Sequence, residues 1–256
     1  MALTAYPVSG KKKSFDICLA FARGAGGQIG TTLREGEAFF YGVDATNSRE
    51  WEGVLSSGQT YWYCDNSYFD ASRQRTFRVT RNALQHSGLG SSDGKRFKAL
   101  GLDIAPWRKA GSHVVVCPQS DHFMRVIVGY PGNWLDETVA GLRQVTDREI
   151  RLRQWSGNKG ALAATLSADL VGAHALVTWS SAAAVTAILA GVPVVAMGQC
   201  AASIMSAGTL DDLENLPMRD DRERWASVLA DNEWTLDEFR SGAAWRSLNA
   251  EEARVV

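Results

Sequence analysis

Cysteine is scarce in this chain of 256 residues, with four in all, at Cys18, Cys64, Cys117 and Cys200. They are far apart and none forms a CxxC pair, so we expect buried free thiols in a reducing cytoplasm and no zinc site. No apolar run reaches the roughly 18 to 20 residues that a membrane-spanning helix needs. The start, "MALTAYPVSGKKKSFD", lacks an apolar stretch followed by a cleavage site. We therefore expect a cytoplasmic protein with no signal peptide and no membrane partner.

Two familiar phosphate-binding motifs are also missing. The chain has no GK[ST] of a Walker loop and no GxGxxG dinucleotide fingerprint. The net charge is only −1, but it is unevenly spread along the chain: residues 1–110 hold 15 Lys and Arg against 10 Asp and Glu, and the remainder holds 12 against 18. A basic front half and an acidic back half indicate two surfaces with different partners. The alternative is a chance distribution on a soluble surface.

The first half of the chain is typical of strands separated by short helices. The run "SFDICLAFA" (14–22) predicts a buried first strand that enters the glycine-rich loop "RGAGGQIG" (23–30). "SREWEGVLSSG" (48–58) predicts a helix that Ser48 caps. Three further strands are expected at 38–43, 60–69 and 75–81.

In the second half, short apolar runs alternate with helical patterns. Strands are expected at 112–120, 148–155, 175–180 and 192–198, with helices at 133–145, 166–173 and 182–191 and two amphipathic helices in the tail, 220–234 and 235–249. Such alternation favours parallel sheets covered by helices on both faces. The sequence therefore predicts an α/β protein of two domains, 1–110 and 111–256.

The loop Trp179-Ser180-Ser181 follows an expected parallel strand and precedes a helix of small residues, "AAAVTAILAG". Ligands of open α/β sheets bind beyond the carboxyl ends of the strands. The first amides of a helix lack partners within the helix and carry the positive end of its dipole, so they bind phosphate readily. The serine hydroxyls would add hydrogen bonds. The alternative is that the serines only cap the helix.

The stretch "ALVTWSSAAAVTAILAGVPVVAMG" resembles the nucleotide-sugar-binding segment of GT-B glycosyltransferases, including the pattern A-x-x-x-G-[VIT]-P-V-[VI] at Ala187 to Val195. The resemblance implies a GT-B-like fold of two Rossmann-like domains whose parallel sheets face a central cleft. It implies that Ser180, Ser181 and Ala182 hold the donor diphosphate and that Gly191 and Pro193 are structural. The expected co-substrate is a nucleotide-sugar, a UDP-sugar by preference, with no other cofactor and no metal.

Further donor-binding residues are expected at strand ends and in the glycine loop. Arg153 and Lys159 follow the strand "REIRLRQW", where the guanidinium fork suits a diphosphate; the alternative is an exposed strand face. Gln119 and Ser120 end the strand at 112–120, and Gly26 lies in the glycine loop. The E-x-x-x-x-x-E pattern of many retaining GT-B enzymes is missing, which leaves Asp211, Asp212 and Glu214 as candidates for the ribose contact.

The first domain is expected to bind the acceptor. Glycosyl transfer needs a group that takes or orients the proton of a hydroxyl. Asp44 and Asp65 both follow apolar strands, and aromatic residues surround Asp65, which makes it the stronger candidate. The alternative for each is a turn-forming role.

Basic residues interspersed with aromatic ones suit phosphate backbones and unstacked bases. The segments "YCDNSYF" and "RVTRN" resemble proteins of tailed phages, in which GT-B enzymes modify hydroxymethylated pyrimidines of DNA. DNA is therefore one expected acceptor, with base flipping required to reach the target; the alternative is that these side chains coat an ordinary surface. The expected DNA contacts are Arg73, Arg75, Arg78, Arg81, Lys95 and Arg96.

Two other functions fit the same sequence. One is an epimerase of UDP-sugars, which would need a histidine close to the donor, and the second half offers only His113, His122 and His174. The other is a non-catalytic phage binding protein that retains the fold.

Overall fold

The computed structural model describes residues 2–69, 76–153 and 165–252. The chain forms two compact units, of which unit 1 comprises Met1–His86 with Asp231–Val256 and unit 2 comprises Ser87–Ala230. This division differs from the predicted boundary at residue 110. The end of the chain returns to unit 1, because its strand pairs with a strand of that unit and its helices pack there.

Unit 1 contains a six-stranded sheet in the order β10-β5-β4-β3-β1-β2. Neighbouring strands from β2 to β4 are parallel, whereas β5 is antiparallel to both β4 and β10. The elements are β1 (Leu3–Ala5), α1 (Lys12–Gly24), β2 (Gln28–Ile29), β3 (Glu37–Tyr41), α2 (Ser48–Ser57), β4 (Tyr61–Asn66), β5 (Thr76–Arg81), β10 (Glu233–Thr235), α8 (Leu236–Arg240) and α9 (Ala243–Glu252).

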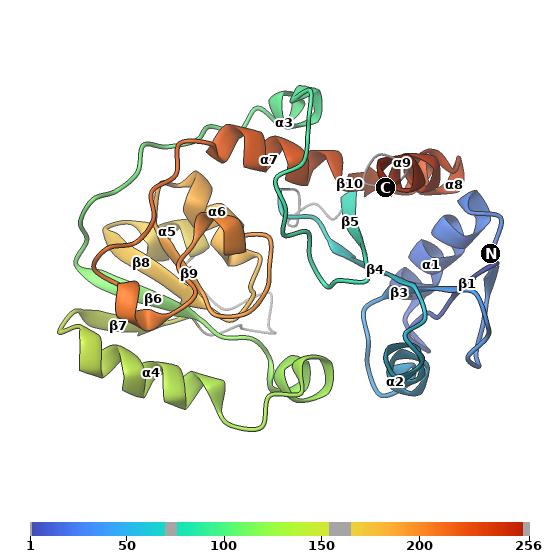
Figure 1. Cartoon of the computed structure of the whole chain (residues 1–256), viewed down its shortest axis with the longest axis horizontal. Helices are drawn as coiled ribbons and strands as arrows, with labels where there is room; N and C mark the ends of the chain where they lie inside the picture. Colours follow the sequence, from blue (N-terminus) through green and yellow to red (C-terminus); the bar gives the residue numbers. More distant parts are fainter. Residues whose placement is uncertain (1, 70–75, 154–164, 253–256) are drawn as a thin grey trace. The chain divides into compact units, whose positions relative to one another are not determined.

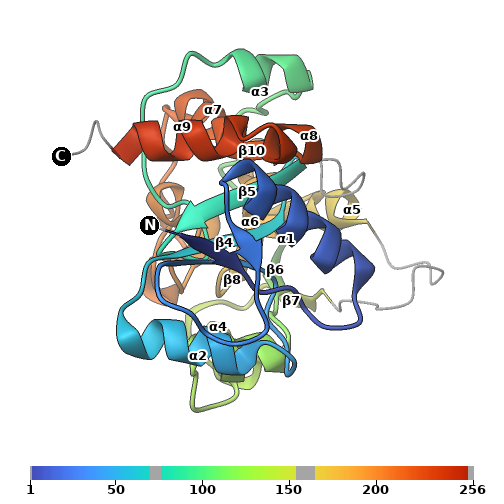
Figure 2. The same cartoon turned by 90° about the vertical axis from the view of Figure 1, so that its right-hand side faces the viewer.

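Helices cover the two faces of this sheet, and Figure 2 shows α2 on the opposite side from α8 and α9. Phe21 of α1 stacks on Phe39 of β3 with ring centroids 4.1 Å apart, and Phe239 of α8 meets Phe21 edge-on. On the α2 side, Trp51 packs edge-on against Phe40. These buried aromatic rings supply much of the apolar area that holds the layers together.

Residues 14–22, which were predicted to form a strand, belong to helix α1, so that prediction is wrong. The buried residues Ser14, Ile17, Cys18 and Phe21 recur at spacings of three and four, as on one face of a helix. Gly24 lets α8 approach closely, since a Cβ there would lie 1.8 Å from the carbonyl oxygen of Phe239. The first strand is instead the short β1, for which no strand was predicted.

Unit 2 contains a parallel four-stranded sheet in the order β7-β6-β8-β9. Helix α4 lies on one face and α5 and α6 on the other (Figure 1). The elements are α3 (Lys95–Leu100), β6 (His113–Cys117), η1 (Phe123–Val128), α4 (Trp134–Val145), β7 (Glu149–Leu152), α5 (Leu166–Leu170), β8 (Ala173–Thr178), α6 (Ala183–Leu189), β9 (Val194–Ala196), η2 (Ser203–Met205), η3 (Leu210–Asp212) and α7 (Arg222–Asp231).

Local sequence explains how several of these helices begin. Asn133 precedes α4, and its side chain accepts a hydrogen bond from the amide of Asp136. Thr235 precedes α8 and forms a capping box with Glu238. In both cases a side chain satisfies an amide that the helix itself leaves without a partner. No helix in the described part of the chain is long and apolar enough to cross a bilayer.

The end of α6 fits the expected structural roles of Gly191 and Pro193. Gly191 has φ +74° just past the helix, a conformation that favours glycine. A Cβ at this position would lie 2.0 Å from the carbonyl oxygen of Pro106. Pro193 directly precedes β9.

Replacing Gly191 by alanine is expected to lower the free energy of unfolding by about 3 kcal/mol or more, because strain and overlap act together. Gly208 is the matched control, since a Cβ there meets nothing within 4 Å. Gly208→Ala is expected to change stability by no more than about 0.5 kcal/mol. Urea denaturation measures both, and equal effects would contradict the prediction.

The uneven charge along the sequence disappears when it is counted by unit. Unit 1 holds 13 Lys and Arg against 14 Asp and Glu, and unit 2 holds 14 against 14. The acidic end of the chain belongs to unit 1, and residues 95–109 with their five basic side chains belong to unit 2. Neither unit therefore has the net positive charge that was expected of an acceptor domain for DNA.

Candidate functional site

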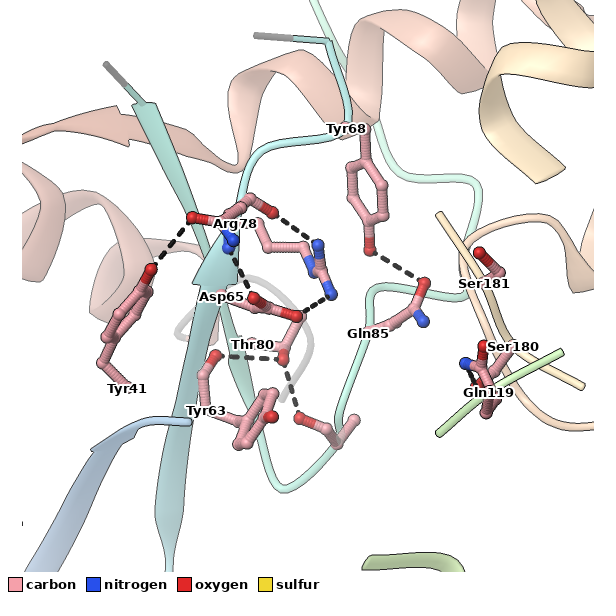
Figure 3. Close-up of polar contacts among 12 residues, drawn as sticks. Tyr41, Tyr63, Asp65, Tyr68, Arg78, Thr80, Gln85, Gln119, Ser180 and Ser181 are labelled. Carbon is pink, nitrogen blue, oxygen red and sulfur yellow. Dashed lines mark hydrogen bonds and ion pairs between the residues drawn. The ribbon is translucent and has the colours of Figure 1, made fainter. Parts of the chain in front are cut away.

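The carboxyl ends of β6 and β8 bring two predicted donor-binding residues together. From β6 the chain runs outward to β7 on one side, and from β8 to β9 on the other, so the order of strands reverses between β6 and β8. Gln119 follows β6 and Ser180 follows β8, and Gln119 Nε2 donates a hydrogen bond of 3.0 Å to Ser180 Oγ (Figure 3). Reversal points of this kind are where open α/β sheets bind ligands. Gln119, Ser180, Ser181 and Ala182 are called the candidate donor site below.

The turn at this site satisfies most of its own backbone groups. Thr178 Oγ1 accepts from the amide of Ser181 at 3.1 Å and donates to the carbonyl oxygen of Cys117 at 2.7 Å. Ser181 Oγ accepts from the amide of Ala183 at 3.3 Å, which is the capping role considered above. The amides of residues 181–185 all lie in the described part of the chain, and of these five only the Ala182 amide makes no hydrogen bond. The expected row of unoccupied amides is thus reduced to one.

Trp179 is a second feature of this turn, and no role was predicted for it. Its ring lies over Gly198, where a Cβ would come within 2.3 Å of the indole Nε1. It also meets Tyr130 edge-on, with ring centroids 5.3 Å apart. The Trp179 indole therefore contacts the segment between η1 and α4 and the segment after β9. The sequence signal was the glycine that follows β9, which leaves room for a large ring.

The other predicted donor residues have local partners or lie elsewhere. Arg153 follows β7, as expected, but its guanidinium forms an ion pair with Asp169, so its charge is already balanced. Ser120 is exposed and accepts from the amide of Phe123 at the start of η1. Lys159 lies outside the described residues.

Gly26 lies at the end of α1 and not after a strand, so the reason for predicting it as a donor residue is wrong. Its amide donates to the carbonyl oxygen of Arg23, and the amide of Gly27 donates to that of Ala22. These bonds end the helix. The turn leads into β2 and therefore lies at the amino end of the sheet, opposite the end where ligands are expected.

Apart from His122, which follows β6, the ribose and epimerase candidates do not lie at the carboxyl end of the unit 2 sheet. Glu214 forms an ion pair with Arg148, just before β7, and its carboxylate lies 3.8 Å from Nε2 of His174, which is near the start of β8. His113 begins β6. This is the amino end of the sheet, opposite Ser180. Asp211 and Asp212 lie on η3, which packs against α4. His122 is exposed near the start of η1.

Asp65 lies at the carboxyl end of β4 in unit 1, where hydrogen bonds hold its carboxylate (Figure 3). Its Oδ2 accepts a hydrogen bond of 2.7 Å from Arg78 Nη2, and its Oδ1 accepts from the amide of Asn66 at 2.7 Å. The Asp65 side chain is 38% exposed, whereas that of Arg78 is 7% exposed. A carboxylate that a buried arginine holds in place, and that is still partly exposed, is suited to act on a substrate hydroxyl.

Asp44 instead has the turn-forming role that was its alternative. Its Oδ1 accepts from both the amide and the hydroxyl of Thr46, at 2.8 and 2.7 Å, and its Oδ2 accepts from Lys11 Nζ at 2.9 Å. Partial burial alone would raise the pKa of Asp44, but the bonds from Thr46 and the charge of Lys11 hold it below the ordinary value. Both oxygens are thus engaged, and the group is a weak base.

The residues predicted to contact DNA do not form one surface. Arg78 is buried, and Arg81 packs over the ring of Trp62. Lys95 and Arg96 lie on α3 in the other unit, and Lys95 pairs with Asp93. Arg73 and Arg75 lie outside the described residues. Four aromatic side chains near these basic residues in the sequence are buried in the core, namely Tyr63, Tyr68, Phe77 and Phe97.

Glu233 is a buried acid beside Asp65 and Arg78, and no role was predicted for it. Its carboxylate accepts from the amides of Tyr68 and Phe69, at 2.5 and 3.4 Å, and from Thr76 Oγ1 at 3.3 Å. Burial raises the pKa of Glu233 to about 7, although these hydrogen bonds and the charge of Arg78 act in the opposite direction. Glu233 reaches this position only because β10 pairs with β5, so the sequence around Glu233 does not predict its contacts with unit 1.

The raised pKa of Glu233 predicts that stability falls as pH rises. An acid with a raised pKa in the folded state contributes its full stabilisation below its unfolded value and loses it as pH rises through the folded value. The window here is from about 4.5 to about 7. Relative to Glu233→Gln, the wild type is expected to lose a few kcal/mol, on the order of 1 to 3, between pH 5 and pH 8. Urea denaturation at both pH values measures this, and parallel curves for the two proteins would refute it.

Comparisons with known proteins identify the fold. No protein-family model matches the chain, and no curated protein sequence does. Among solved structures, KpsC β-Kdo 2,7 transferase of Thermosulfurimonas dismutans matches with a TM-score of 0.56 at 12% identity, over 98% of this chain and 100% of that one. KpsC β-Kdo 2,4 transferase of the same organism matches with a TM-score of 0.53 at 11% identity, over 89% of each chain. The chain therefore has a GT-B-like α/β fold, as its sequence predicts.

Proposed function

We propose that the protein is a glycosyltransferase that uses a nucleotide-sugar donor. The observation that carries this proposal is the hydrogen bond between Gln119 and Ser180 at the reversal point of the unit 2 sheet. Ser180 lies within the segment whose sequence resembles a nucleotide-sugar site, and the chain has a fold that glycosyltransferases also have. Fold alone does not fix function, so the proposal depends on this site.

At the donor site, the leaving phosphate would be bound by neutral groups. The Ala182 amide and the Ser181 hydroxyl would donate hydrogen bonds to it, and Gln119, which donates to Ser180 Oγ, lies at the same end of the sheet. Donors fixed in place stabilise charge as it develops on the leaving oxygen, because they need no reorganisation during the reaction. Arg153 is not assigned to the phosphate, since it is paired with Asp169.

On the acceptor side, Asp65 would take the proton from the attacking hydroxyl. The hydroxyl oxygen bonds to the anomeric carbon, the bond from that carbon to the phosphate oxygen breaks, and the proton passes to the Asp65 carboxylate. Asp65 is preferred to Asp44 because its side chain is 38% exposed and accepts two hydrogen bonds, whereas that of Asp44 is 27% exposed and accepts three.

A hydroxyl of a small or polymeric sugar is the acceptor that we favour. The two solved structures with a similar fold are named as transferases of Kdo, which is a sugar. A hydroxymethylated pyrimidine in DNA is the second acceptor to test, although the burial of Arg78 and the lack of a net positive charge on either unit give it less support. An epimerase is less well supported, because His113 and His174 lie at the opposite end of the sheet from Ser180, and only the exposed His122 lies at the same end.

Thermal unfolding with a panel of UDP-, GDP-, CMP- and CDP-sugars tests the donor. One class of donor is expected to raise the melting temperature through mass action, and no rise with any of them would refute the donor site. Radiolabelled transfer from that donor to oligosaccharides, and separately to hydroxymethylated DNA, then identifies the acceptor. Conversion of the donor to its epimer without transfer would favour the epimerase.

A further inference from the structure

We infer that Arg78 is a positioning residue, which holds Asp65 and the chain after it in the arrangement that acceptor activation needs. The inference rests on the proposed function, in which Asp65 takes the acceptor proton. It adds a residue whose role is to fix that carboxylate and not to touch the substrate.

The sheet places Arg78 opposite Asp65 by its register. Asp65 on β4 pairs with Arg78 on β5, which in turn pairs with Glu233 on β10. Directly opposed residues of antiparallel strands project from the same face. The guanidinium donates through Nη2 to Asp65 Oδ2 at 2.7 Å and through Nη1 to the carbonyl oxygen of Asn66 at 2.5 Å (Figure 3). One arginine thus holds both the carboxylate and the backbone that follows it.

A second set of contacts holds the guanidinium itself. The ring of Tyr68 lies 4.6 Å from Arg78 Cζ, and the Tyr68 hydroxyl donates to Gln85 Oε1 at 3.3 Å. Glu233 fixes Tyr68 from the other side by accepting from its amide at 2.5 Å. Within the described residues, the buried Nε of Arg78 has no hydrogen-bond partner. The position of the guanidinium therefore satisfies the two Nη groups and leaves Nε without a hydrogen bond.

The two members of this ion pair differ in exposure, because Arg78 is buried and Asp65 is partly exposed. A buried charge needs a close partner, because removal from water is costly. Burial alone would lower the pKa of Arg78, but the neighbouring Asp65 carboxylate raises it, so the guanidinium stays charged. The guanidinium holds one side of the Asp65 carboxylate, and the exposed side is left to the substrate.

Lysine is not an adequate replacement for this arginine. A guanidinium is planar, donates two parallel hydrogen bonds and stacks on an aromatic face, whereas an ammonium group is a point charge on a flexible stem. Arg78→Lys keeps a positive charge beside Asp65 but loses the planar guanidinium and its two parallel hydrogen bonds. A matched control is Arg81→Lys, since Arg81 lies on the same strand and also packs over an aromatic ring.

Two measurements on the full chain test the inference. The first is hydrogen exchange of the amides of residues 66–69, which is expected to quicken about tenfold in Arg78→Lys and not in Arg81→Lys. The second is steady-state transfer, in which Arg78→Lys is expected to lower kcat by about 10- to 100-fold with the donor KM unchanged. A merely structural role would not separate kcat from KM in this way.

The outcomes are distinguishable. Unchanged exchange overturns the inference, as does faster exchange with a wild-type kcat. Faster exchange with a reduced kcat supports it, and 10 mM guanidinium is then expected to restore part of the kcat of Arg78→Gly. If the wild type transfers no sugar but the exchange of residues 66–69 responds to Arg78→Lys, the proposed function is refuted and the holding role of Arg78 is supported.

Discussion

Replacing Asp65 by asparagine is expected to lower the turnover rate by about 100-fold or more and to leave donor binding unchanged. Asparagine keeps the shape of the side chain, and its Oδ1 can still accept a hydrogen bond from Arg78. It has no capacity to take a proton from the acceptor hydroxyl. Steady-state transfer measures the rate, and calorimetric titration with donor measures binding.

Asp44→Asn is the matched control for this variant. It also follows a strand at the carboxyl end of the same sheet, but it is less exposed than Asp65 and accepts three hydrogen bonds, from Thr46 and Lys11. We expect turnover within about threefold of the wild type and a loss of about 1 kcal/mol in the free energy of unfolding, since its polar partners are weakened. Full turnover by Asp65→Asn, or loss of turnover by Asp44→Asn alone, would reverse the assignment of the base.

Replacing Ser181 by glutamate is expected to weaken donor binding by about 100-fold or more, because like charges brought together cost several kcal/mol. The negative side chain would lie beside the Ala182 amide, where we place the phosphate of the donor. Folding is expected to be retained, since an acidic residue before a helix interacts favourably with its dipole. Calorimetric titration measures binding, and a denaturation curve checks folding.

Ser112→Glu adds the same charge to the other end of the same sheet. Ser112 is exposed and directly precedes β6, so this variant is expected to bind donor as the wild type does. Equal weakening by both variants would mean that net charge and not position is responsible. Unaltered binding by Ser181→Glu would leave the serines with the capping role alone.

The candidate donor site was largely predictable because its signals are local. A buried apolar run, a turn with serines, a helix of small residues and "AGVP" occur in order within 25 residues, and each element forms where the pattern predicts it. The pairing of Gln119 with Ser180 follows from the fact that both residues end neighbouring parallel strands. The turn's own hydrogen bonds were harder to foresee, because the Thr178 hydroxyl that accepts from Ser181 is part of the buried strand.

Unit 1 was less predictable, since its key relations are between distant residues. The run 14–22 is apolar enough to suit a strand, and only its spacing of buried residues separates it from a helix. The segment 233–235 becomes a strand because β5 offers it an edge about 155 residues earlier in the chain. Glu233 therefore joins Asp65 and Arg78 through tertiary structure alone, and the surface arginines expected for DNA prove to include a core residue.

The pairing of β10 with β5 has a consequence for the order in which the protein folds. Unit 2 is an uninterrupted stretch of chain, whereas unit 1 is made of two segments, one on either side of it. During synthesis, residues 87–230 emerge complete before β10, α8 and α9 exist, so unit 2 is able to fold first. Residues 1–86 must wait for the end of the chain with the edge of β5 unpaired. The contacts of Glu233 around Arg78, and with them the final environment of Asp65, then form among the last events of folding.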